Sequence, residues 1–266
     1  MKRSVLCITF ILAVVCLSAQ QPVLLRNAQY LGFEGTHVNL PSGATIVFWN
    51  DTSSGSSDVM AQKVNSEGLV LWPGPRPIAS SALEDRVISV TLSSDDNIIV
   101  YYYNYASDVD GFSYWLQKFS QAGQPLWGGQ GILVSSEFSA PKRGCLVPNA
   151  IGGAYLIYKS SLPAYNIYGM NLDSSGTNLW PHTPLSSYSS ITNVQALEDG
   201  FGGVIINYCY NVSGSSAQNR LIRLDAAGDI VGTDPLLDPA SVVPLEFSIM
   251  KDGQGNFILY TMHWLD

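Results

Sequence analysis

A glycine recurs at nearly constant spacing along the chain, and similar residues surround each copy. The four copies of this glycine, which lie 55, 53 and 52 residues apart, are Gly68, Gly123, Gly176 and Gly228. A tryptophan follows four residues later in three copies, as Trp72, Trp127 and Trp180. An apolar residue always stands four positions before the glycine, with mostly polar neighbours. This alternation predicts a half-buried strand that enters a glycine turn and leaves as another strand.

A second series of predicted hairpins interleaves with the first. Its return strands lie at 44–49, 97–103, 153–158, 203–208 and 256–262, each after a short turn signal such as "PSG" or "IGG". One unit is therefore four short strands in about 53 residues. Such a unit is typical of a β-propeller, in which antiparallel blades bury their faces against each other.

The predicted fold class is therefore an all-β propeller of four-stranded antiparallel blades. The units lie near 37–86, 87–142, 143–193 and 194–246, with a partial unit at 247–266. That makes about 4.5 blades, which indicates an incomplete propeller. The alternative is an irregular five-bladed ring with a defective closing blade.

The repeated glycine and tryptophan have predicted structural roles. The glycine supplies the turn between the third and fourth strands, because glycine tolerates the left-handed backbone of tight turns. The tryptophan is expected to begin the fourth strand and to fill the seam between blades. An aromatic platform for sugars is the alternative reading, but the regular recurrence favours packing.

Two stretches, 58–80 and 114–136, resemble a repeat of secreted bacterial propeller-like proteins. The pattern of that repeat is roughly D-I-Y-x-Q-x-x-x-x-x-G-x-x-x-W-x-x-x-G-x-x-V-S. The matching residues of these two copies are Asp58, Gln62, Gly68, Trp72, Gln117, Gly123, Trp127, Gly131 and Val134. Many proteins with this repeat resemble surface-associated cargo of the type IX (Por) secretion system of Bacteroidetes-like bacteria. The resemblance implies a fold and a location at the cell surface, and it implies no activity. The sorting domain of such cargo is absent from this sequence.

The first 19 residues are typical of a signal peptide. Lys2 and Arg3 precede an apolar run at 5–17, and Ser18 and Ala19 offer a cleavage position. The propeller repeats would then occupy 20–266, and the protein would be secreted or displayed at the cell surface, with no membrane span after cleavage. A retained membrane anchor is the alternative. Cys145 and Cys209 remain after cleavage, and their different positions in the repeat favour two free thiols.

The charge of the chain bears on its partners. The formal net charge is −8, and removal of the predicted signal peptide leaves 11 basic and 21 acidic residues. An acidic domain without a basic patch argues against nucleic acid and against anionic membranes. A glycan or a surface protein is the expected partner.

Candidate site residues are few. No zinc or catalytic serine motif is present, and His37, His182 and His263 lie far apart, so neither a metal site nor a cofactor is predicted. The acidic candidates, which lie in loops between the second and third strands, are Asp51, Asp58, Asp108 and Asp110. Such acids are able to serve a glycosidase or to bind Ca²⁺, and "DVDG" at 108–111 faintly resembles a calcium loop. Tyr101 and Tyr103 share one strand face and are candidates for stacking against a ligand, with packing as the favoured alternative.

These observations favour a non-catalytic binding or scaffold module. The reason is that the sequence has a strong structural repeat and no recognisable set of catalytic residues. The alternative is part of a carbohydrate-active enzyme, a glycosidase or lyase, that uses the loop carboxylates.

Overall fold

The structure is a computed structural model, and every regular element among its described residues is a β strand. It describes residues 35–53, 55–107, 111–137, 144–160, 166–181, 184–186, 191–213, 216–232, 236–238, 246–252 and 254–262. The described strands form five sheets, and neighbouring strands in each sheet are antiparallel and consecutive in sequence. No helix in these ranges has the length and hydropathy needed to cross a bilayer.

The strands of the five sheets have the following bounds. The first sheet contains β1 (Gly35–Asn39), β2 (Thr45–Asp51), β3 (Asp58–Val64) and β4 (Arg76–Ala79). The second contains β5 (Glu84–Leu92), β6 (Ile98–Ser107), β7 (Gly111–Phe119) and β8 (Ile132–Glu137). The third contains β9 (Gly144–Pro148), β10 (Ala154–Ser160) and β11 (Asn166–Leu172), and an isolated bridge joins Tyr168 to Pro184. The fourth contains β12 (Ile191–Glu198), β13 (Val204–Ser213), β14 (Ser216–Leu224) and β15 (Leu236–Asp238). The fifth contains β16 (Glu246–Lys251) and β17 (Phe257–Met262).

The prediction of an all-β fold built from four-stranded antiparallel sheets is confirmed. The five return strands of the sequence analysis are β2, β6, β10, β13 and β17, and each begins one residue after the predicted start. The turn glycines also adopt the expected backbone, because Gly68 and Gly123 have φ angles of 81° and 78°. Period-two alternation and turn chemistry therefore located these elements correctly.

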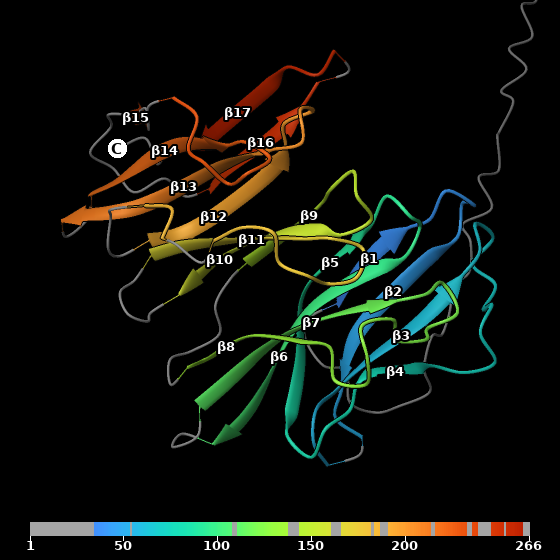
Figure 1. Ribbon diagram of the computed structural model, residues 1–266. Coiled ribbons are helices and arrows are strands. Elements are labelled where there is room, and N and C mark those ends of the chain that lie inside the picture. The colour runs from blue at the N-terminus through green and yellow to red at the C-terminus, as the bar shows by residue number, and fades with distance from the viewer. Residues whose placement is uncertain are drawn as a thin grey trace, which may run out of the picture.

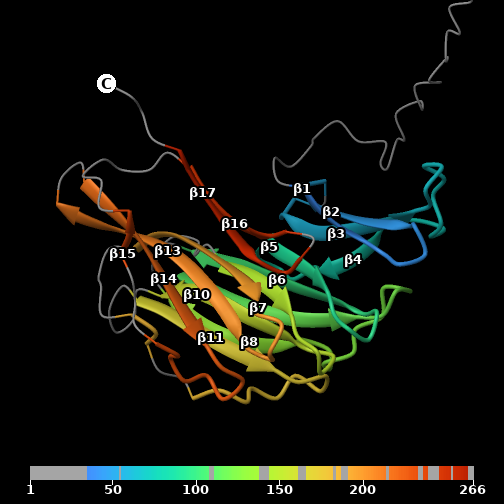
Figure 2. The same cartoon turned by 90° about the horizontal axis from the view of Figure 1, so that it is seen from above.

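The first strand of each sheet lies next to the first strand of the following sheet. β5 contacts both β1 and β9, and β12 contacts both β9 and β16. In Figures 1 and 2 the sheets follow one another around an arc in chain order, from blue to red. The arrangement is propeller-like, with the first strands inside and the later strands outside.

The connections divide the molecule into two ends. In an antiparallel sheet whose strands follow in order, the first and third connections lie at one end and the second lies at the other. We call the end with the strand 1–2 and strand 3–4 turns the turn end. The loop end carries the strand 2–3 loops and the connections between sheets.

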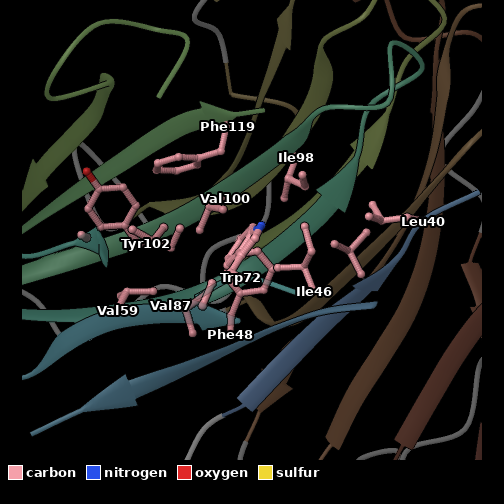
Figure 3. Packing of buried hydrophobic residues seen from close by; sticks show 14 of the residues in the cluster. Leu40, Ile46, Phe48, Val59, Trp72, Val87, Ile98, Val100, Tyr102 and Phe119 are labelled. Carbon is pink, nitrogen blue, oxygen red and sulfur yellow. The ribbon is translucent and has the colours of Figure 1, made fainter. Parts of the chain in front are cut away.

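Apolar clusters fill the space between consecutive sheets among the first four. Between the first and second sheets, Ile46 and Phe48 of β2 meet Ile98 and Val100 of β6, with Trp72 among them (Figure 3). The alternate residues of β6, such as Ile99, belong to the cluster with the third sheet. A sheet in this position buries both faces, so its middle strand reads as a continuous apolar run rather than an alternation.

Each repeated tryptophan packs on the repeated glycine of the following sheet. A Cβ atom added at Gly123 would lie 3.5 Å from Trp72, and one at Gly176 would lie 3.1 Å from Trp127. The expected role in the seam is confirmed, but the expected position at the start of the fourth strand is wrong. Trp72 precedes β4 by four residues, because the chain first forms an isolated bridge between Val64 and Val70, and β4 begins only at Arg76.

Candidate functional site

Two of the predicted acids lie opposite each other at the loop end of the first sheet. Asp51 ends β2 and Asp58 begins β3, and the two residues are partners in the register of these strands. Asp51 is buried, and its Oδ1 accepts a hydrogen bond of 2.9 Å from the backbone N–H of Ser53. Two carboxylates on one face repel each other, so this end of the hairpin carries concentrated negative charge.

Asp85 is a third acid, which lies at the start of the second sheet. Its backbone N–H donates to the carbonyl oxygen of Ser57 at 2.6 Å, and its Oδ2 accepts from the N–H of Ser81 at 2.6 Å. The residue is 1 % exposed, and its Oδ1 and the Oγ of Ser57 have no hydrogen-bond partner. Burial raises the pKa of Asp85 above 3.8, the charge of Asp58 raises it further, and the hydrogen bonds from Ser81 oppose the shift.

These three acids define the chemistry available at the loop end. A carboxyl with a raised pKa is a proton donor, and a nearby ionised carboxylate is the pattern of acid–base pairs. The two carboxyl groups differ in their access to solvent, since Asp85 is buried and Asp58 is only half-buried. Within the described ranges, no three His, Cys, Asp or Glu residues are grouped in a way that would bind a metal ion.

The structure places the other predicted site residues differently. Asp108 and Asp110 lie outside the described residues. Tyr101 and Tyr103 are 0 % and 8 % exposed, in the cluster between the second and third sheets. This is the packed position that the sequence favoured as the alternative, and neighbouring rings such as Tyr114, with its centroid 6.2 Å from that of Tyr101, lie on the same face. Stacking of these two rings against a ligand stays a prediction. Asp85 was missed, since only its long-range contacts distinguish it from other loop acids.

A second feature, at the turn end, repeats in the first four units. The residue three positions after the repeated glycine is aliphatic and exposed in each of them. These residues, which we call the exposed aliphatic positions, are Leu71, Leu126, Leu179 and Val231, with exposed fractions of 48 %, 47 %, 51 % and 42 %. Their backbone N–H groups all donate to the residue five positions before that glycine, at 2.7–2.8 Å. The four side chains therefore stand in equivalent positions around the arc.

Local sequence explains why this geometry repeats. The turn in the first sheet begins at Asn65, whose Oδ1 accepts from the N–H groups of Glu67 and Leu69. Asp173 does the same for Ser175 and Thr177 in the third sheet. Such side-chain caps, followed by glycine at positive φ, fix a tight turn with a bulge. The exposed aliphatic residue then emerges at a set distance from the turn.

Bonds between neighbouring sheets hold the turn end rigid. Lys118 of β7 is 2 % exposed, and its Nζ donates to Asp95 Oδ2 at 2.6 Å and to the carbonyl oxygen of Gly152 in the third sheet at 2.7 Å. Ser94 Oγ accepts from the N–H of Gly152 at 2.9 Å. The hydroxyl of Tyr155 donates a hydrogen bond to the carbonyl oxygen of Gly202 in the fourth sheet. A buried charge with several hydrogen bonds restricts the geometry of its neighbours.

Comparisons with known proteins concern the fold. No protein-family model matches the sequence, and no curated protein matches it. A protein of unknown function from Dyadobacter fermentans is similar in structure, with a TM-score of 0.57 and 12 % identity over 90 % of this chain and 77 % of that one. An α-L-arabinanase from Penicillium chrysogenum has a TM-score of 0.53 at 12 % identity, over 87 % and 72 %. NanB sialidase from Streptococcus pneumoniae has a TM-score of 0.50 at 11 % identity, over 80 % of this chain and 38 % of that one. At such low identity these likenesses show a propeller-like fold and nothing of the site.

Proposed function

We propose that this protein is a non-catalytic binding or scaffold module, secreted or displayed at the cell surface, with the fold of an incomplete β-propeller of about 53-residue repeats. The proposal rests on the predicted signal peptide at 1–19 and on the packing of the sheets against one another. The resemblance to type IX secretion cargo supports the surface location.

The exposed aliphatic positions carry this proposal. Leu71, Leu126, Leu179 and Val231 are each nearly half exposed, and the same backbone hydrogen bond holds each of them. Exposed apolar groups on a rigid frame mark a surface for association. Their aliphatic character favours a protein partner over a glycan, since sugars stack on aromatic rings and the repeated tryptophans are buried.

The test is a binding screen of the purified chain against extracellular matrix and cell-surface proteins, with a glycan array beside it. We expect a protein ligand, and we expect the double variant Leu126→Ser/Leu179→Ser to weaken it at least tenfold, about 1.4 kcal/mol. Leu133→Ser is the matched control, because Leu133 is 50 % exposed but lies on β8 outside the repeated position. No binding in either panel, or binding by the double variant as tight as that of the wild type, would reject the proposal.

A second candidate is a role in carbohydrate cleavage, which the acids at the loop end favour. In this reading Asp85 donates a proton and Asp58 acts as the base or nucleophile. The similar arabinanase and sialidase folds support it only at the level of the fold. The 1 % exposure of Asp85 weighs against it, since a sugar would have to displace the covering chain near Ser81. Release of sugar from a polysaccharide panel, abolished by Asp58→Asn and Asp85→Asn, would establish cleavage, and no product from any substrate would exclude it.

A further inference from the structure

The five described sheets follow one another in the same direction around the arc. One face of the first sheet and one face of the fifth sheet are therefore not packed against another of these sheets. In the three seams between the first four sheets, the onward face of one sheet packs on the rear face of the next. Ile46 and Phe48 of β2 are onward residues of the first sheet, and they share a cluster with Ile98 and Val100 on the rear of the second. Ile99 and Tyr101, on the onward face of the second sheet, share a cluster with Leu156 of the third.

The onward face of the fifth sheet has the composition of these seams but stays open. Ile258 of β17 pairs with Met250 of β16, and Tyr260 lies two residues further along the same face. The three side chains are 46 %, 47 % and 49 % exposed. In the aligned return strands, Ile258 and Tyr260 correspond to Ile46 and Phe48, each of which is 1 % exposed. The chain's own first sheet therefore does not cover this face.

The rear face of the first sheet is the matching surface. Val47 and Trp49 of β2 lie on it, and Met60 of β3 is the register partner of Trp49. All three side chains are partly exposed, whereas Val100 and Tyr102, their counterparts on the rear of the second sheet, are buried against a preceding sheet.

We propose that the onward face of the fifth sheet binds the rear face of the first sheet of a second copy. The chain thereby associates head to tail through a seam of the same kind that joins its own sheets. Such an interface is heterologous, since it uses two different surfaces of each copy, and it is independent of what the turn end binds. Continuity with the internal seams identifies the occupant, because the apolar faces of the first four described sheets meet by front-to-back stacking.

The test is sedimentation velocity of the purified chain over about a hundredfold range of concentration. We expect mass to rise with concentration. We expect Ile258→Lys on the onward face and Met60→Lys on the rear face each to weaken self-association at least tenfold. Leu133→Lys is the control, because it adds the same charge at an exposed leucine of β8. Circular dichroism confirms folding, and Met60→Gln replaces Met60→Lys if the latter does not fold.

Mixing the two variants decides the geometry. The Ile258→Lys chain keeps its rear face and the Met60→Lys chain keeps its onward face, so the mixture forms dimers with one seam while neither variant self-associates. A wild-type chain that stays monomeric throughout would overturn the proposal. A mixture that stays monomeric would overturn it as well, since the contact would then not run from front to rear.

Discussion

The indole Nε1 of Trp127 donates a hydrogen bond of 3.0 Å to the carbonyl oxygen of Ser174, two residues before Gly176 in the next sheet. Trp180 repeats this contact with Ala226, two residues before Gly228, at 2.9 Å. Each tryptophan thus lies on the following glycine turn and bonds its backbone. The ring fills the seam, and the hydrogen bond fixes the position of one sheet relative to the next.

Replacing Trp180 separates these two contributions. We expect Trp180→Ala to lower the free energy of unfolding by about 3–5 kcal/mol, because a large buried ring is lost. Trp180→Phe keeps most of the packing and loses the hydrogen bond, so about 1–2 kcal/mol is expected. Urea unfolding measures both, and Leu179→Ala, at the exposed neighbour, is the control with little effect. Equal losses for the alanine and phenylalanine variants would contradict the packing role.

The glycine beneath that ring has a matched control four residues away. Gly228 and Gly232 have φ angles of 88° and 86°, so alanine at either position meets similar backbone strain of about 1–2 kcal/mol. A Cβ at Gly228 would lie 2.8 Å from Cγ of Trp180, whereas Gly232 has open space around it. Gly228→Ala should therefore destabilise the protein by about 1–3 kcal/mol more than Gly232→Ala in urea unfolding. No difference between the two would show that the ring moves away freely.

Loss of the partner of the buried Lys118 should lower the stability of the protein more than replacement of Lys118 itself. Asp95→Asn leaves the Lys118 ammonium, 2 % exposed, without a counter-ion. Lys118→Met leaves Asp95, whose side chain is 39 % exposed and therefore solvated. We expect Asp95→Asn to be the more destabilising variant at neutral pH by thermal unfolding. The reverse order would mean that the carbonyl oxygens alone stabilise the charge.

The ion pair of Asp95 also predicts how the stability of the protein changes at acidic pH. Its partial burial raises its pKa, but hydrogen bonds from Lys118 and Ser93 outweigh this, and the pKa is lowered from 3.8. A carboxyl with a lowered folded-state pKa stabilises the protein above its unfolded pKa, and this stability is lost as pH falls through the folded value. The advantage of the wild type over Asp95→Asn should therefore shrink below about pH 4. Thermal unfolding across that range measures it, and a constant difference would contradict the ion pair.

Asp85 should change the stability of the protein with pH in the opposite direction. Because its pKa is raised in the folded state, the unfolded chain ionises first, and stability falls as pH rises from 3.8 through the folded value. We expect Asp85→Asn, of nearly the same shape, to gain stability relative to the wild type as the pH rises above 3.8. Urea midpoints at several pH values test this. A gap that does not change with pH would place Asp85 in contact with water.

The sequence predicted the sheets well because local chemistry determines them. Gly68 requires a positive φ whatever lies around it, and the alternation before it describes a strand. Lys118 shows the limit of such reasoning. A lysine in a period-two strand reads as solvent-facing, yet its burial depends on Gly152, which belongs to another sheet. Nothing within a few residues of Lys118 encodes that neighbour.

The candidate sites show the same division. The loop position of Asp51 and Asp58 was readable, since both flank a turn-rich segment. The character of Asp85 was not, because its raised pKa comes from burial against Ser57 and Ser81. The exposed aliphatic positions carried a sequence signal that went unused. An aliphatic residue recurs three positions after each glycine, and a search for repeated apolar residues outside the strands would have found it.

The tryptophan contacts all point the same way along the chain, and this has a consequence for synthesis on the ribosome. The turn that covers the ring of Trp72 contains Gly123, which is translated 51 residues later. At about 5–20 residues per second this interval lasts roughly 3–10 s. Between the translation of Trp72 and that of Gly228, the nascent chain therefore carries one of these indole rings uncovered at nearly every stage. The uncovered ring always belongs to the most recently translated repeat.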